Sequence, residues 1–139
     1  KGSGAAVIAH LSGEISAQIP SLPTAMSYIR SNRLRALGVT TAKRSPYLPE
    51  IPAIGETVPG YEVSAWFGLF GPAKLPPAIV EKLYKEASKA VTEPTLAAKM
   101  EAGGTETVGN PTREFTQQTK AEYEKWRNLV KKANLKLEN

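Results

Sequence analysis

The sequence contains no cysteine, so disulfide bonds, thiolate metal sites and cysteine nucleophiles are excluded. Its single histidine, His10, belongs to no metal-binding pattern such as H-x-x-x-H or H-E-x-x-H. Nucleophile elbows, P-loops and dinucleotide fingerprints are also absent from the sequence. We therefore expect no enzymatic activity and no cofactor. A hydrolase-like enzyme would have to use His10 as its general base, and the sequence identifies no partner for it.

Long apolar runs are missing too. No window approaches the roughly 20 consecutive apolar residues that span a membrane. No signal peptide is recognisable either. Because the chain opens directly on Lys1-Gly2-Ser3-Gly4, this lack of a leader says nothing about export.

The composition is typical of a folded domain. The chain has 139 residues, of which 41% are hydrophobic and 22% charged, and a domain of this size can bury roughly 70% of its extended surface. The net charge of +5 would suit an anion, a nucleic acid or an acidic protein surface. The basic residues are spread along predicted helices, many beside glutamates, which favours solvated helix faces.

Hydrophobic periodicity divides the chain into strands and helices. Apolar runs predict strands over Ile15–Ile19, Leu34–Val39, Val63–Phe70 and Thr105–Val108. Amphipathic spacing and capping residues predict helices over Ala5–Ser12, from Ser21 to Asn32, over Ala78–Thr92 and Pro94–Met100, and after Asn110-Pro111. Strands and helices alternate through the first third, so parallel pairing with right-handed crossovers is expected. The predicted fold class is α/β, a parallel or mixed sheet flanked by helices.

A proline-rich connector separates the strands Leu34–Val39 and Val63–Phe70. It contains Pro46, Pro49, Pro52 and Pro59. Each proline fixes φ and removes a backbone donor, so the passage is expected to be neither helix nor central strand. A stiff link between two buried strands is typical of the place where a chain crosses between two lobes.

Two strand-to-helix turns carry groups that suit an anion. One is Gly2–Gly4 and the other is Pro20–Thr24, where Ser21 is a helix cap. Free amides and the partial positive charge of a helix N-terminus favour a carboxylate or phosphate. Ordinary capped loops are the alternative. In open α/β sheets, ligands bind outside the carboxyl ends of strands, so both turns are expected on the same rim.

Four linked segments carry a family resemblance. They are Leu34–Thr40 (LRALGVT), Lys43-Arg44-Ser45-Pro46, the connector Pro52–Tyr61 and Trp66–Ala73 (WFGLFGPA). In this order they resemble the TctC-like or Bug family, the solute-binding receptors of tripartite tricarboxylate transporters. The connector has one residue fewer than usual before Pro59-Gly60. The resemblance extends over the whole chain but covers only about the second half of the family's length.

The resemblance implies a periplasmic-binding-protein-like lobe, with C-terminal helices returning to a first lobe that this sequence lacks. Residues 1–62 would be part of the second lobe. Residues 63–139 would be the crossover strand and a helical segment packing toward the first lobe. The implied function is a periplasmic receptor that captures a small carboxylate and delivers it to membrane transporter subunits, with no bond made or broken.

The ligand-binding residues expected from these features are Gly2, Ser3, Gly4, Ser21, Trp66 and Phe67. Amides and hydroxyls of the first four would hold the carboxylate oxygens, partly through bridging waters. The two aromatic residues line the cleft only if the resemblance holds at that strand, and core packing is the alternative. The family commonly has an aspartate and a small polar residue where this chain has Pro20-Ser21. That departure favours an acidic or neutral ligand over an amino acid.

Two further expectations follow. A basic module that binds nucleic acid or an acidic protein remains the alternative function, and it predicts strongly salt-dependent binding. With a first lobe absent, apolar surface meant for it would be exposed, so the chain is expected to self-associate. Its ligand affinity should also be weak, since closure of two lobes supplies much of the contact.

Overall fold

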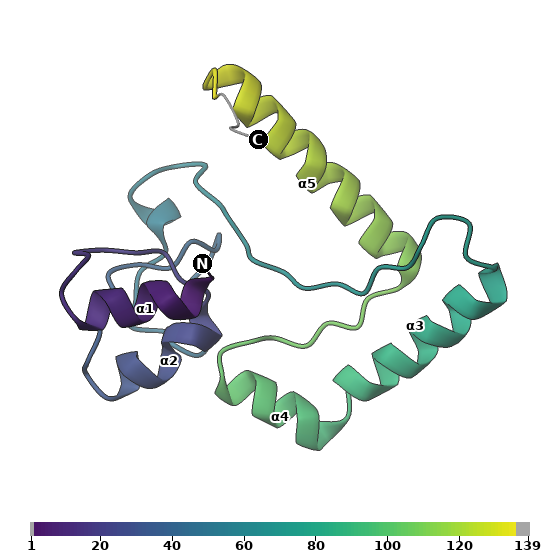
Figure 1. The fold of residues 1–139 in the computed structure, drawn as a ribbon, viewed down its shortest axis with the longest axis horizontal. Helices are drawn as coiled ribbons and strands as arrows, with labels where there is room; N and C mark the ends of the chain where they lie inside the picture. The colour runs from purple at the N-terminus through teal and green to yellow at the C-terminus, as the bar shows by residue number, and fades with distance from the viewer. Residues whose placement is uncertain (1, 136–139) are drawn as a thin grey trace. The chain divides into compact units, whose positions relative to one another are not determined.

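The computed structural model describes residues 2–135, which form helices joined by long irregular segments (Figure 1). The helices are α1 (Ser3–Leu11), α2 (Leu22–Arg30), the 3₁₀ helix η1 (Ile54–Glu56), α3 (Pro77–Val91), α4 (Pro94–Ala102) and α5 (Thr112–Lys132). Every predicted helix is therefore present, with its ends within a few residues of the expected positions. The described chain forms two compact units, unit 1 with residues 2–72 and 93–107 and unit 2 with residues 73–92 and 108–135.

Several helices end in the same way, which explains why their C-termini were predictable. In α1, α2, α4 and α5 the residue after the C-cap has a positive φ: Gly13, Asn32, Gly104 and Asn134. At the end of α1, the Glu14 amide donates to the Ala9 carbonyl (2.9 Å) and the Gly13 amide to the His10 carbonyl (3.1 Å). These two hydrogen bonds form the Schellman motif, which needs a left-handed backbone conformation at the residue after the C-cap. Glycine and asparagine tolerate that conformation.

The buried core of unit 1 is small and combines two helices with the connector. Val7 of α1, Ala25 and Met26 of α2, and Leu48 and Ala53 of the connector are all at most 5% exposed. The sequence predicts an apolar face on α2 through Ala25, Met26 and Ile29, of which the first two are buried and Ile29 is half-buried. On α1 it predicts that Ile8 and Leu11 share an apolar face, but the buried side chain is that of Val7, whereas Ile8 is 66% exposed.

Helix α4 packs against α2 within unit 1. The Arg30 guanidinium donates to the Ala102 carbonyl at 3.1 Å. Gly104, with φ +83°, lies so close to α2 that a Cβ built there would be 2.8 Å from side-chain atoms of Leu22 and Met26. The absence of a side chain at this position therefore lets the end of α4 approach the core.

The predicted strands do not form as strands in the described residues. The one strand pairing within residues 2–135 is an isolated parallel bridge between Val39 and Ala53. In it, the Val39 amide donates to the Pro52 carbonyl and the Ile54 amide to the Val39 carbonyl, both at 2.9 Å. An apolar run is only a candidate strand, because a strand also needs a neighbour with continuing hydrogen bonds.

The connector contains one isolated bridge and one short 3₁₀ helix. It supplies Ala53 to the bridge and forms η1, so the expectation that it contains no helix is wrong at residues 54–56, and in the described residues it contains no central strand. Its prolines flank these features without interrupting them, since Pro52 uses only its carbonyl in the bridge. At Thr40, the residue after Val39 of the bridge, the carbonyl accepts a hydrogen bond from the Val63 amide at 2.8 Å.

Unit 2 consists of α3 and α5. The Ser88 hydroxyl donates to the Gly109 carbonyl at 3.1 Å, which ties the end of α3 to the approach to α5. The sequence predicts a buried stripe on α5 through Phe115, Tyr123, Trp126 and Val130. In the described chain Phe115 and Val130 are half-buried, whereas Tyr123 is 66% and Trp126 39% exposed, so the stripe is not buried as predicted. Burial of an apolar stripe requires a surface that covers it.

The contact between Gly104 and α2 gives a stability prediction. Gly104→Ala should reduce the free energy of unfolding by about 2–5 kcal/mol, because it adds overpacking against Leu22 and Met26 to the strain of a left-handed alanine. Urea unfolding followed by circular dichroism measures this change.

Gly13→Ala is the matched control. Gly13 has nearly the same φ, +81°, but no atom within 4 Å of a built Cβ. Gly13→Ala should reduce the free energy of unfolding only through backbone strain, by about 1–2 kcal/mol. Equal losses for the two variants would contradict the packing of α4 on α2.

Candidate functional site

The start of α1 leaves backbone donors exposed. Gly2 is its N-cap, and no side chain caps the helix. The first amides that bond back are those of Ala5 and Ala6, both to the Gly2 carbonyl at 3.1 and 3.5 Å. The amides of Ser3 and Gly4 have no partner within residues 2–135, and both residues are exposed. This end of the helix can therefore accept an anion without displacing an existing bond.

The start of α2 presents hydroxyls. Ser21 is the N-cap, yet its side chain does not cap the helix. Its Oγ instead lies 2.7 Å from the Thr24 Oγ1, so one hydroxyl donates to the other. The accepting hydroxyl then keeps its own proton for another partner. Thr24 is a member of this pair that the sequence alone did not single out.

The two helix starts lie at the same end of a packed pair. α1 and α2 are in contact, and Figure 1 shows that both begin on the same side. The returning segment runs back beside α1, where the Gln18 amide lies 3.1 Å from His10 Nδ1. The common rim predicted for Gly2–Gly4 and Pro20–Thr24 stays a prediction: the two helices are in contact and begin on the same side in Figure 1, but the described residues contain no paired sheet beneath them. The bond to Gln18 also gives His10 a structural partner.

Electrostatics at these two starts differ from those at α4. Neither α1 nor α2 has an acidic residue in its first turn. At α4 the Glu93 carboxylate accepts from the Leu96 amide at 2.9 Å, and hydrogen bonds from Thr95 and Leu96 lower the pKa of Glu93. The positive end of α4 is thereby neutralised, whereas the positive ends of α1 and α2 are not.

The two aromatic candidates lie in different surroundings. Trp66 is half-buried and its ring packs on that of Phe70, with the centroids 6.3 Å apart. Phe67 is 81% exposed. The structure therefore does not enclose Phe67 in a cleft.

A separate cavity of about 480 Å³ lies at the other end of α2, between that helix and the connector. Asn32, Arg35 and Glu50 are among its lining residues, and no predicted site residue is. It adjoins the negative end of the helix dipole, which disfavours an anion. In the described residues no group of His, Asp and Glu side chains is arranged to hold a metal ion.

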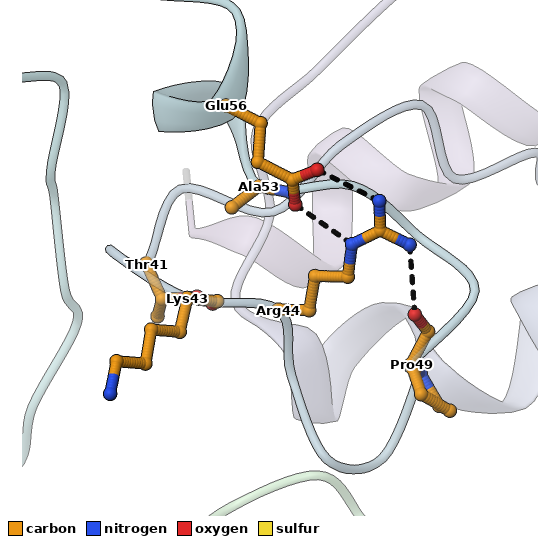
Figure 2. A network of polar contacts seen from close by, with 6 residues as sticks. All are labelled: Thr41, Lys43, Arg44, Pro49, Ala53 and Glu56. Carbon is orange, nitrogen blue, oxygen red and sulfur yellow. Dashed lines mark hydrogen bonds and ion pairs between the residues drawn. The ribbon is translucent and has the colours of Figure 1, made fainter. Parts of the chain in front are cut away.

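A polar network within the proline-rich connector holds this segment in place (Figure 2). The Arg44 guanidinium donates from Nε and Nη2 to the two carboxylate oxygens of Glu56, each at 2.8 Å, and from Nη1 to the Pro49 carbonyl at 3.3 Å. The Ala53 amide donates to the same carboxylate at 2.9 Å. In the sequence, Arg44 beside Lys43 is a candidate to pair with an anion, with a solvated position on an exposed turn as the alternative. Its partner, twelve residues away, follows no helical or strand spacing.

This network changes the titration of its carboxylate. Hydrogen bonds from Arg44 and then from the Ala53 amide lower the pKa of Glu56 from 4.5 to about 2. The same carboxylate raises the pKa of Arg44. Both side chains are nearly half exposed, so the network's main effect is geometric: it holds η1 against the bridge at Ala53.

Comparison with known proteins assigns the chain to a family. The profile of the family described as "Tripartite tricarboxylate transporter family receptor" matches residues 1–135. The chain belongs to this family. It is 36% identical, over 94% of its length, to the "UPF0065 protein in tcbD-tcbE intergenic region" of Pseudomonas sp. (strain P51), and 31% identical, over 99%, to "Protein BugT" of Bordetella pertussis. It spans only 39% and 42% of these two proteins.

Solved structures of receptors agree with this assignment. The structure described as "R. palustris Rpa4515 with adipate" superposes with a TM-score of 0.87 at 30% identity, covering 96% of this chain and 45% of that one. Periplasmic binding protein BugD gives a TM-score of 0.84 at 27% identity, covering 98% and 46%. The predicted periplasmic-binding-protein-like fold is confirmed at this level, while its sheet is not formed in the described residues.

The family decides two other predictions. This receptor family is not a family of enzymes, so the prediction that the chain is not an enzyme is confirmed. The resemblance to TctC-like receptors is likewise confirmed. Within residues 2–135, no helix is both long and apolar enough to cross a bilayer.

The Arg44–Glu56 network generates a pH prediction. A lowered pKa stabilises the folded state fully above about pH 4.5, and this stabilisation is lost as pH falls toward 2. The difference in melting temperature between wild type and Glu56→Gln should therefore shrink between pH 5 and 2. Thermal unfolding at a series of pH values measures it.

Glu50→Gln is the control, because Glu50 is an exposed carboxylate of the same connector that forms no hydrogen bond or ion pair among the described residues. Its melting temperature should differ little from that of wild type, because the substitution removes no contact of the Glu50 side chain. A Glu56→Gln difference that does not change with pH would contradict the network.

Proposed function

We propose that this chain is part of a periplasmic receptor that captures a small carboxylate and delivers it to the membrane subunits of a tripartite tricarboxylate-type transporter. Membership of the receptor family supports a solute-binding role. One similar structure is described with adipate, a dicarboxylate. Because the chain spans less than half of the relatives compared, the ligand and the transporter contact are proposals for the protein of which it forms a part.

The observation that carries the proposal is the pair of open helix starts. The Ser3 and Gly4 amides of α1 and the Ser21–Thr24 hydroxyls of α2 lie at the same end of two packed helices. No acidic side chain in either first turn competes for these donors. A carboxylate would gain charge-assisted hydrogen bonds and two favourable dipoles.

Binding would use the residues in distinct roles. Gly2 and Gly4 leave open space, since a Cβ built at either has no atom within 4 Å, so the ligand can approach the backbone closely. Ser3 contributes its amide, and Ser21 contributes its hydroxyl. Trp66 and Phe67 are proposed to line the cleft when a first lobe closes over it, supplying apolar contact for the carbon chain of the ligand. No group in this arrangement is needed for a chemical reaction.

The nucleic-acid alternative has less support from the side chains. Three basic residues of α3 and α5 form ion pairs with glutamates on their own helices: Lys85–Glu81, Lys125–Glu122 and Arg127–Glu124. At these positions the surface carries both signs of charge. Binding of duplex DNA that weakens steeply with salt would favour this alternative over the receptor.

The class of ligand can be tested with a matched pair. Adipate should raise the melting temperature of the chain at millimolar concentration, and 2-aminoadipate, which adds only an amino group, should raise it less. The reason is that Pro20-Ser21 offers no carboxylate to an ammonium group. Thermal shift titration measures both, because a ligand stabilises the state that it binds. A stronger effect of 2-aminoadipate would contradict the proposed ligand class.

The role of Ser21 can be tested separately. Ser21→Ala should weaken adipate binding by roughly 10- to 100-fold, the usual effect of losing one hydrogen bond to a charged group. Isothermal titration calorimetry measures the affinity. Ser31→Ala changes the same residue type at the opposite, exposed end of α2 and should leave it unchanged. Similar losses in both variants would show that the helix start is not the binding point.

A further inference from the structure

The Thr24 hydroxyl bonds differently from the hydroxyls of three other threonines. Thr92 at the end of α3 and Thr116 and Thr119 in α5 each donate to the carbonyl of the residue four positions earlier, at 2.7–2.8 Å. For Thr24 the residue four positions earlier is Pro20, which precedes the N-cap of α2. Its hydroxyl lies 2.7 Å from that of Ser21 instead. The side chain of Thr24 therefore serves the start of the helix and not its internal hydrogen bonds.

The first turn of α2 has few backbone donors left for a ligand. Its first three residues are Leu22, Pro23 and Thr24. Pro23 has no N–H, and the Thr24 amide donates to the Ser21 carbonyl at 3.0 Å. Of these three residues, only Leu22 has an amide that forms no backbone hydrogen bond within residues 2–135. The contribution of α2 to an anion site thus depends strongly on the Ser21 hydroxyl.

The chemistry of a carboxylate fixes the direction of the bond between the two hydroxyls. A carboxylate only accepts hydrogen bonds, and a serine hydroxyl has a single proton to donate. If the Ser21 proton goes to the ligand, Ser21 Oγ has to accept in its contact with Thr24. Thr24 then donates to Ser21, and Ser21 donates to the carboxylate. Hydrogen bonds in such a chain polarise and strengthen one another.

We propose that Thr24 is a positioning residue of the carboxylate site, because its hydroxyl donates to Ser21 Oγ and so directs the Ser21 proton toward the ligand. This inference rests on the function proposed above, in which Ser21 contributes its hydroxyl. Thr24 is well suited to the task, since its β-branched side chain restricts χ1 and its neighbours Ala25 and Met26 are buried in the core of unit 1. Thr24 itself needs no contact with the ligand.

Two substitutions of Thr24 test the hydroxyl separately from the shape of the side chain. Thr24→Val keeps the branched shape and removes the hydroxyl, so it should weaken adipate binding by roughly 2- to 10-fold, the usual effect of losing one neutral hydrogen bond. Thr24→Ser restores the hydroxyl and should bind adipate as wild type does. Isothermal titration calorimetry on the 139-residue chain measures both affinities.

A double-mutant cycle with Ser21→Ala separates positioning from a purely structural role. If Thr24 acts through Ser21, adding Thr24→Val to Ser21→Ala should cause no further loss of adipate affinity. A structural role at the start of α2 would weaken binding by the same factor in both backgrounds, which would overturn the inference.

The same titrations distinguish failure of this inference from failure of the proposed function. If Ser21→Ala weakens adipate binding and Thr24→Val does not, the site stands and the role of Thr24 is refuted. If Ser21→Ala leaves adipate binding unchanged, Ser21 is not a ligand contact, and both the proposed site at α2 and the role of Thr24 are refuted.

Discussion

The packing of α1 against α2 is the contact on which the account of this chain depends. Val7 on one helix and Ala25 and Met26 on the other are almost fully buried, and few other side chains in the described residues are. This small core sets the two helices with their N-termini at the same end. If the helices were not held in this way, their open amides and hydroxyls would be isolated capping positions. Together they form a concentrated positive field with donors and no competing carboxylate.

The same core is stabilised from outside by two features, one of which contacts the first residue of α2. Gly104 lets α4 approach Leu22 and Met26. Arg44 and Glu56 hold the connector so that Leu48 and Ala53 remain buried. Both features fix the core that carries the helices, while the amides of Ser3 and Gly4 stay accessible. A receptor that must bind and release a solute benefits from this division, because the binding groups stay preorganised while the contacts that close over the ligand can separate.

Sequence patterns predicted the helices well and the strands poorly, for a physical reason. A helix such as α1 is specified locally, by Gly2 at its start, Gly13 at its end and apolar spacing between them. A strand such as Val63–Phe70 needs a neighbour with continuing hydrogen bonds, and in the described residues this stretch does not form a strand. The Arg44–Glu56 pair was missed because it connects residues across a loop of no regular period. The helix starts were anticipated, but the hydroxyl partner Thr24 depended on side-chain geometry.

The most direct measurement of the central claim is a nuclear magnetic resonance titration of the ¹⁵N-labelled chain with adipate. The account predicts that the amide signals of Ser3, Gly4 and Leu22 shift most, in step with one another, because one carboxylate sits on both helix starts. Shifts centred on the cavity near Asn32 and Arg35 instead, or no shifts at saturating adipate, would contradict it.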